Sequence, residues 1–440
     1  MKWAVYNLLF LAVYPFLLPG FLTRMLKRGG YAARFGDRFA LYPQEILEKL
    51  GTKPVSHDFA KGEFVWIHAV SVGEVQVAGQ LMREWRKVEP EVRFCFSTTS
   101  STGWKMAEKE VTERDVLIYN PLDFPNFVKS AFRTVRPRAV VLTESEIWPN
   151  FIRRARKFGV PLFLVNARVS DRSAPRYKLA KCFFGDVFRC FTRIFAQSEL
   201  DKARLVAAGA PADRTEVTGS FKFDVARRNP AKEAELRAWV GEGRILLGGS
   251  TWPGEDETLL GIYGRLLATA ADGNRDLRLV IAPRHFEKAD AVEANISKFG
   301  FGCIRRSRGE SNNRTIEQSN ISPSVFLADT TGELMGLYGI ADVVFVGKSL
   351  CAHGSQNMIE PCLCGKPTVV GPYTENFRPV MSDLLDGEGI VQVKDAAELE
   401  MKIGELLASG AALGERARAA VERRCGVVPK CVSAIREAIR

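Results

Sequence analysis

Short apolar runs alternate with amphipathic stretches along most of the chain, and this alternation is the strongest constraint on its fold. Each run has about the length of a buried strand, and the stretches between runs carry apolar residues at helical spacing. Such a pattern predicts an α/β protein with parallel sheets covered by helices on both faces. The candidate strands are Phe64–Ile67, Arg93–Phe96, Ala139–Leu142, Pro161–Val165 and Arg193–Ala196 in the first half, and Arg244–Leu247, Leu277–Ile281, Ser324–Ala328, Val343–Val346 and Pro367–Val370 in the second.

The two halves repeat one local pattern. An apolar run leads through a Ser- and Gly-containing turn into Gly73-Glu74 and an amphipathic helix in the first half, and into Gly254-Glu255 and a second such helix in the other. A chain of 440 residues is expected to form two domains. We place the linker at residues 219–232, which are rich in Gly, Asn, Pro and charge, and expect a ligand-binding cleft between the domains.

The composition indicates a globular protein with an anionic partner. The net charge of +11 and the pI near 9.2 are compatible with nucleic acid, a phospholipid surface or a phosphorylated substrate, and charge alone does not choose among them. The nine cysteines show no C-x-x-C pair, so we expect free thiols in a reducing compartment and no zinc site.

The amino terminus is set apart by a segment without charge, Trp3–Thr23, which is about as long as a bilayer is thick. Pro15 weakens the regularity of a helix there, so both a spanning and an in-plane anchor at residues 1–25 remain open. A cleaved signal peptide is the competing interpretation, but no small-x-small cleavage site is evident. Basic residues between 24 and 38 follow, whereas only Lys2 precedes, which places the body of the protein on the cytoplasmic side.

Glu74 is the first candidate for catalysis. It stands at the opening of a predicted helix and at the carboxyl end of the predicted strand Phe64–Ile67, where open α/β sheets bind their ligands. Free backbone N–H groups and the helix dipole favour a carboxylate at this place. Such a carboxylate can take a proton from a hydroxyl group.

Other polar groups follow predicted strands in both halves. In the second half, Ser355, Asn357 and Glu360 follow a Gly-rich turn that is suited to anions and ribose hydroxyls, although helix capping explains the same residues. Arg284 and His285 end a strand and can bond a phosphate or form surface ion pairs. In the first half, the candidates for binding or for purely structural roles are Thr99, Glu144 and Arg168.

Taken in order, these segments resemble the 3-deoxy-D-manno-octulosonic acid (Kdo) transferases of Gram-negative inner membranes, which add Kdo from CMP-Kdo to a lipid A precursor. Each motif is weak alone, but their order and spacing across nearly the whole chain are specific. The matching stretches are His68–Glu74, Thr143–Asn150, Asn166–Ser173, Phe221–Asp224, Pro283–His285, Thr331–Leu334 and Asn357–Pro361.

The resemblance implies a GT-B glycosyltransferase with two Rossmann-like domains, the acceptor domain at 26–218 and the CMP-Kdo domain at 233–425, and a helix at 426–440 that returns to the first domain. It implies inverting transfer without a metal or other cofactor, on the cytoplasmic face of the inner membrane, with CMP-Kdo, a lipid A precursor and an anionic membrane surface as partners. Glu74 would be the general base. The other implied site residues are Ser71 and Gly73 in its loop, Glu144 and Arg168 at the acceptor, and Ser250, Thr251, Arg284, Gly332, Glu333, Asn357 and Glu360 at the donor.

The chain departs from the family pattern at two donor-side positions. Lys348 stands where a Gly is common, and Gln356 where a His is common. Lys348 therefore either adds a charge to the donor site or points away from it.

Two other functions are compatible with parts of the sequence. One is a GT-B glycosyltransferase or epimerase that uses a UDP-sugar, and the other is a non-catalytic, basic, membrane-tethered binding protein. Nucleic acid is not an expected partner, because the basic residues are scattered and not interleaved with aromatic ones. Walker, nucleophile-elbow and H-E-x-x-H motifs are absent, so the corresponding hydrolase classes lack support.

Overall fold

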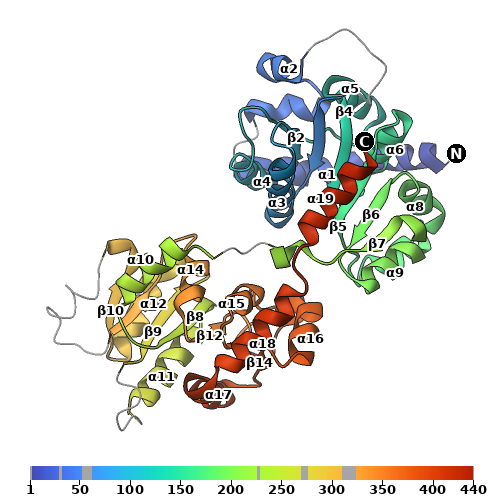
Figure 1. Cartoon of the computed structure of the whole chain (residues 1–440). Coiled ribbons are helices and arrows are strands. Elements are labelled where there is room, and N and C mark those ends of the chain that lie inside the picture. Colours follow the sequence, from blue (N-terminus) through green and yellow to red (C-terminus); the bar gives the residue numbers. More distant parts are fainter. Residues whose placement is uncertain are drawn as a thin grey trace. The chain divides into compact units, whose positions relative to one another are not determined.

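A parallel seven-stranded sheet lies at the centre of each of two units in the computed structural model of the chain (Figure 1). The structure describes residues 2–28, 32–51, 62–224, 228–268, 276–309 and 324–439. Unit 1 comprises Met1–Asp224 together with Gly426–Arg440, and unit 2 comprises Val225–Cys425. Of the predicted linker, residues 225–227 lie outside the described ranges.

Unit 1 has the strand order β3-β2-β1-β4-β5-β6-β7, with every neighbouring pair parallel. Its strands are β1 (Phe64–His68), β2 (Arg93–Thr98), β3 (Val116–Tyr119), β4 (Pro137–Thr143), β5 (Leu162–Ala167), β6 (Arg193–Ala196) and β7 (Thr215–Val217). Its α-helices are α1 (Lys2–Arg28), α2 (Gln44–Leu50), α3 (Val72–Val88), α4 (Ser101–Ala107), α5 (Pro125–Val135), α6 (Pro149–Lys157), α7 (Ala174–Leu179), α8 (Lys181–Phe188), α9 (Glu199–Ala207) and α19 (Val427–Ala438).

Unit 2 has the order β10-β11-β9-β8-β12-β13-β14, again with parallel pairs. Its strands are β8 (Ile245–Thr251), β9 (Arg278–Pro283), β10 (Gly302–Arg305), β11 (Ser324–Leu327), β12 (Val343–Val346), β13 (Thr368–Val370) and β14 (Val391–Gln392). Its α-helices are α10 (Pro230–Val240), α11 (Glu255–Ala268), α12 (Ala289–Lys298), α14 (Leu334–Ile340), α15 (Ile359–Leu363), α16 (Arg378–Asp386), α17 (Ala396–Ser409) and α18 (Ala411–Glu422).

All ten predicted strands are confirmed, and so is the parallel α/β class. The reason is visible in β1, where every side chain is buried. Phe64 and Trp66 belong to the core on one face of the sheet, whereas Val65 and Ile67 belong to the core on the other. A strand covered by helices on both faces has no wet side, so it appears in the sequence as a continuous apolar run.

The repeated turn occupies the same place in both sheets. In unit 1, β1 lies between β2 and β4, and in unit 2, β8 lies between β9 and β12, so each is the strand at which the order of the sheet reverses. The helix that follows each strand begins near the shared Gly-Glu pair. Ligands of open α/β sheets bind beside the carboxyl ends of the strands at this switch point.

The last helix of the chain completes unit 1. Helix α19 contacts α3, and Val428, Cys431 and Ile435 are buried in the core beneath it. The carboxylate of Asp224 accepts hydrogen bonds from the N–H groups of Gly426 and Val428, both at 2.6 Å. Two segments far apart in the sequence are thus fastened together at the point where the chain leaves and re-enters unit 1.

The first ten residues of α1 are attached to unit 1 by one side of the helix. Tyr6 donates a hydrogen bond to Asp123 at 2.9 Å, and Asn7 accepts one from Asn150 at 2.7 Å. The side chains of residues 21–33, which include part of the predicted basic cluster, lie outside the description. In the part of the chain that the structure does describe, no helix has both the length and the apolar character that crossing a membrane requires.

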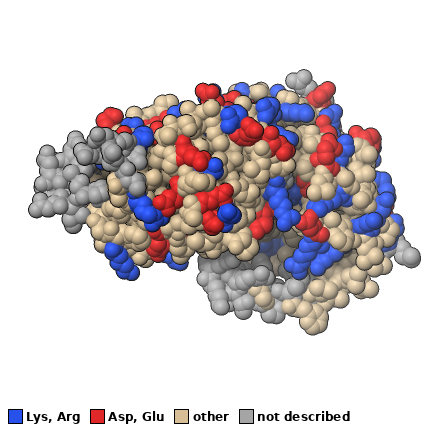
Figure 2. Space-filling model, turned by 90° about the horizontal axis from the view of Figure 1, so that it is seen from below, with Lys and Arg blue, Asp and Glu red and all other residues tan. Residues whose placement is uncertain are grey.

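The positive net charge is not gathered into one surface on the face drawn in Figure 2. Lys and Arg side chains are interspersed there with Asp and Glu. Among the described residues many Lys and Arg side chains form ion pairs with carboxylates, such as Arg83 with Glu110 and Arg265 with Glu400.

Candidate active site

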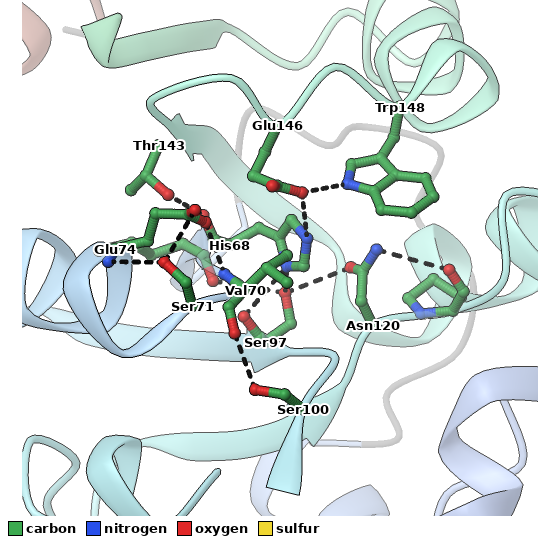
Figure 3. Close-up of polar contacts among 12 residues, drawn as sticks. His68, Val70, Ser71, Glu74, Ser97, Ser100, Asn120, Thr143, Glu146 and Trp148 are labelled. Carbon is green, nitrogen blue, oxygen red and sulfur yellow. Dashed lines mark hydrogen bonds and ion pairs between the residues drawn. The ribbon is translucent and has the colours of Figure 1, made fainter. Parts of the chain in front are cut away.

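The turn between β1 and α3 holds Glu74 at the carboxyl end of the sheet of unit 1 (Figure 3). Ser71 is the N-cap of α3, and its hydroxyl accepts a hydrogen bond from the Glu74 N–H at 3.3 Å. The Glu74 carboxylate in turn accepts from the Val70 N–H at 2.8 Å and from the Ser71 hydroxyl at 2.9 Å. The side chain is therefore fixed at the rim of the sheet, and Glu74 retains 9% of its surface exposed.

The space beside this turn is open at Gly73. A Cβ atom added there would meet no heavy atom within 4 Å. The start of α3 therefore has free room on one side, next to Glu74.

Thr99 lies between β2 and α4, where its carbonyl accepts a hydrogen bond from Arg38 at 2.7 Å.

Glu144 and Arg168 follow the neighbouring strands β4 and β5 and form an ion pair of 2.9 Å. Asn166 donates to the other oxygen of Glu144 at 3.3 Å. Burial raises the pKa of the Glu144 carboxyl, Arg168 opposes this, and the charge of Glu74 adds to the increase. Glu74 and Glu144 both follow strands of this sheet at its carboxyl end, so the two carboxylates share one rim.

Glu144 and Asn166 also have backbone conformations that are uncommon for side-chain-bearing residues. Their φ angles are 51° and 53°, in the left-handed region that favours glycine. Such conformations cost free energy and concentrate at functional sites. The ion pair of Glu144 and Arg168 is compatible with both roles that the sequence left open for these residues, binding and a purely structural one.

His68 and Glu146 belong to the same cluster, although the sequence analysis did not choose them as site residues. Glu146 accepts a hydrogen bond from the Trp148 indole at 2.7 Å, and the same oxygen lies 3.7 Å from Nε2 of the buried His68 (Figure 3). The other ring nitrogen of His68 lies 3.0 Å from the carbonyl oxygen of Ser97. The two contacts of His68 join β1 to its neighbour β2 and to the loop after its other neighbour β4, so they depend on the sheet order and no local sequence signal reports them.

Unit 2 contains a pocket of about 370 Å³ at the carboxyl ends of its strands. Its lining follows β8, the strand at which the order of the sheet reverses, and the strands β9 and β11 to one side of it. The pocket brings together five of the donor-side residues predicted from sequence, namely Ser250, Arg284, His285, Gly332 and Glu333.

Glu333, which lines the pocket, is held by two cations. It accepts hydrogen bonds from Arg306 at 3.0 Å and from Lys232 at 2.8 Å, and a further one from Thr330. Burial by itself would raise the pKa of Glu333, but these partners lower it to about 2. The Glu333 carboxylate is thus held in place as an anion, and Arg306 and Lys232 balance its charge.

The remaining donor-side candidates do not line this pocket. The Gly-rich turn before Asn357 was predicted to bind an anion, but two of its N–H groups already donate within the protein. Ser355 N–H donates to the Lys348 carbonyl at 2.8 Å, and Gln356 N–H donates to the Gly347 carbonyl at 3.0 Å. Asn357 donates to Glu360 at 3.0 Å, and burial raises the pKa of the Glu360 carboxyl. Thr251 is buried at the end of β8.

No metal centre is found among the described residues, where no three His, Cys, Asp or Glu side chains are grouped so as to hold an ion.

The two Rossmann-like sheets define the class of the protein as GT-B-like. A solved glycosyltransferase from Rickettsia africae superposes on 86% of this chain and 99% of its own with a TM-score of 0.54, at 14% identity. At that identity the likeness shows the fold alone.

Relatives in sequence give the family. A family model described as 3-deoxy-D-manno-octulosonic-acid transferase (kdotransferase) matches residues 33–225. The 3-deoxy-D-manno-octulosonic acid transferase of Haemophilus influenzae is 31% identical, with 92% of this chain and 90% of the relative covered, and that of Bordetella pertussis is 34% identical, with 92% and 94% covered. The chain belongs to the family of 3-deoxy-D-manno-octulosonic acid transferases and is a glycosyltransferase.

Proposed function

We propose that the protein transfers Kdo from CMP-Kdo to a lipid A precursor in lipopolysaccharide synthesis, with inversion at the anomeric carbon and with Glu74 as the general base. The observation that carries the proposal is the fixed Glu74 carboxylate at the switch point of unit 1, in a chain whose relatives are Kdo transferases. The donor is assigned to unit 2 and the acceptor to unit 1.

Glu74 has the capacity that a base requires. A carboxylate offers about four lone pairs for hydrogen bonding, and the Val70 N–H and Ser71 hydroxyl use two of them. The remaining ones can accept the proton of an attacking sugar hydroxyl on the open side next to Gly73. Positioned general bases contribute roughly 10²–10⁴-fold to rate.

The other rim residues of unit 1 suit an acceptor that carries hydroxyl and phosphate groups. Glu144 and Glu146 can accept hydrogen bonds from hydroxyls, and Arg168, whose side chain is 58% exposed, can donate to an anion. Because Asn166 and Arg168 fix Glu144, and Trp148 fixes Glu146, little conformational entropy is lost on binding.

In unit 2 the pocket is assigned to the cytidine nucleotide. Departure of CMP leaves negative charge on its phosphate, and Arg284 on the pocket wall can stabilise that charge. Gly332, with φ of 84° and open space beside it, allows close approach of the ligand to the backbone.

The membrane surface is proposed as a further partner through α1. Apolar side chains on the side of α1 that is not attached to unit 1 are exposed, including Leu8 at 68% and Phe16 at 84%. Arg153 of the basic helix α6 lies over the ring of Trp3 at 4.8 Å, and its charge is the main cause that lowers the pKa of Lys157. Apolar groups beside concentrated positive charge favour binding of α1 in the plane of the anionic cytoplasmic leaflet.

The test is direct transfer. The purified protein is incubated with CMP-Kdo, generated in situ, and a tetraacylated lipid A precursor, and the products are counted by mass spectrometry. Addition of one or more Kdo residues, inhibited by CMP and not by UDP, supports the proposal. Absence of transfer together with binding of UDP in preference to CMP would favour the UDP-sugar alternative.

A further inference from the structure

Lys348 lies beside the pocket of unit 2, at the carboxyl end of β12. Strand β12 pairs with β8, and the N–H of Gly347 donates to the carbonyl of Gly249 at 2.8 Å. A Cβ atom on Gly347 would come within 2.3 Å of the Ser250 carbonyl oxygen, so this turn and the pocket residue Ser250 are in direct contact. Lys348 is the next residue along the chain.

The backbone of Lys348 is held in an uncommon conformation. Its φ angle is 56° and that of Ser250 is 54°, so side-chain-bearing residues at the ends of two neighbouring strands are both left-handed. The buried carboxylate of Glu255 accepts hydrogen bonds from the N–H groups of Lys348 at 2.8 Å and Ser349 at 3.0 Å. These two hydrogen bonds fix the turn in place, although glycine would adopt this left-handed backbone conformation more readily than lysine.

The side chain of Lys348 is directed by an aromatic ring. Its ammonium lies 4.8 Å from the centre of the Trp252 indole, a separation at which a cation is attracted to the ring face. The Trp252 ring packs against the ring of His285 with a centroid distance of 5.3 Å. Since His285 lines the pocket, the Trp252 ring links the Lys348 ammonium to the edge of the pocket.

Among the described residues the Lys348 ammonium has no carboxylate within ion-pair distance. Lys232 and Arg306, by contrast, are both paired with Glu333. Arg284 is likewise unpaired among the described residues. Arg284 lines the pocket, and Lys348 is linked to it through Trp252 and His285, so two cations without counter-ions among the described residues belong to this region. The nearby N–H groups of Ser355 and Gln356 are already used.

We infer that Lys348 is a further donor-binding residue, whose ammonium hydrogen-bonds the anionic part of the nucleotide-activated sugar next to His285. This inference rests on the proposed assignment of the donor to unit 2. The chemistry fits a phosphate or a sugar carboxylate, both of which are oxyanions that an ammonium binds strongly. The phosphate is the expected contact, because Ser250 and Arg284 bring the nucleotide to this edge.

Two variants separate charge from structure. Lys348→Met keeps the aliphatic chain over Trp252 without the charge, and Lys348→Gly removes the side chain where the backbone conformation favours glycine. Lys298→Ala, at the exposed end of α12, is the control for loss of one positive charge. Thermal unfolding is expected to show that Lys348→Gly is at least as stable as the wild type, so its binding defect does not come from misfolding.

Isothermal titration with CMP and with cytidine gives the readout. Both Lys348 variants are expected to bind CMP about 10- to 100-fold more weakly, to bind cytidine as the wild type does, and to show a shallower dependence on salt. Normal CMP binding with a tenfold or greater rise in KM for CMP-Kdo would place the ammonium on the sugar carboxylate instead.

Two results would overturn the inference. CMP affinity and KM for CMP-Kdo within twofold of the wild type in both variants would show that Lys348 does not bind the donor, while the proposed function stands. A wild-type protein that binds neither CMP nor CMP-Kdo would overturn the donor assignment as well as the role of Lys348.

Discussion

Replacement of Glu74 by glutamine separates the proposed base from its role as a helix cap. In the wild type the carboxylate accepts hydrogen bonds from the Val70 N–H at 2.8 Å and from the Ser71 hydroxyl at 2.9 Å. Glutamine keeps the first bond through its amide oxygen and can donate its amide N–H to the Ser71 hydroxyl. The cap of α3 is therefore preserved in shape, but the side chain can no longer take a proton.

The two roles predict losses of different size. Exchanging a charged for a neutral acceptor at these bonds is expected to cost about 1 kcal/mol of unfolding free energy. Removal of a general base slows transfer roughly 10²–10⁴-fold, which is about 3–5 kcal/mol in the activation barrier. Glu74→Ala loses both capping bonds and costs about 1–2 kcal/mol of stability with a similar loss of rate.

The assay compares kcat for Kdo transfer, CMP affinity and urea unfolding in the wild type and both variants. We expect transfer to collapse in Glu74→Gln and Glu74→Ala while CMP affinity stays within twofold. Transfer by Glu74→Gln at a rate close to that of the wild type would refute the base assignment. If only Glu74→Ala were impaired, in proportion to its instability, Glu74 would be a helix cap and nothing more.

Three further predictions concern stability and the membrane. Because the pKa of Glu333 falls from an ordinary 4.5 to about 2 on folding, its charge stabilises unit 2 above about pH 4.5, and this contribution is lost as the pH falls toward 2. The unfolding free energy of the wild type should therefore exceed that of Glu333→Gln by up to about 3 kcal/mol at pH 7 and by much less at pH 3. An equal difference at both pH values would contradict the ion-pair account. Deletion of residues 426–440 should destabilise unit 1, measured by proteolysis, and leave unit 2 protected, since α19 covers α3. Leu8→Asp should weaken sedimentation with anionic vesicles by tenfold or more, whereas Met401→Asp in unit 2, also exposed, should not; equal binding by both would exclude α1 from the contact.

The sequence pattern predicted the central strands of each sheet but not the strands at its two edges. The four strands that were not predicted, β3, β7, β10 and β14, are the outermost strands of the two sheets. Three of them have fewer buried positions than the central strands, so the apolar run that reports burial on both faces is weakened. The exception is β3, which is fully buried and only four residues long.

The candidate site divides in the same way between local and distant contacts. The setting of Glu74 could be predicted, because a strand, a Ser N-cap and a glutamate three residues later are all encoded within one short segment. The approach of His68 to Glu146 could not, since it depends on the pairing of β1 with β4. The N–H groups of Ser355 and Gln356 looked free for an anion, but a loop that folds back on itself uses them.

The placement of α19 has a consequence for the order in which the protein matures during synthesis. The helix that begins next to Glu74 is covered by the final residues of the chain, and all of unit 2 is translated between the two. At roughly 5–20 residues per second, the ribosome needs about 10–40 s for the roughly 200 residues of unit 2. During this interval the apolar surface of α3 that α19 covers is without its native partner, so unit 1 can complete its core only after unit 2 has been synthesised.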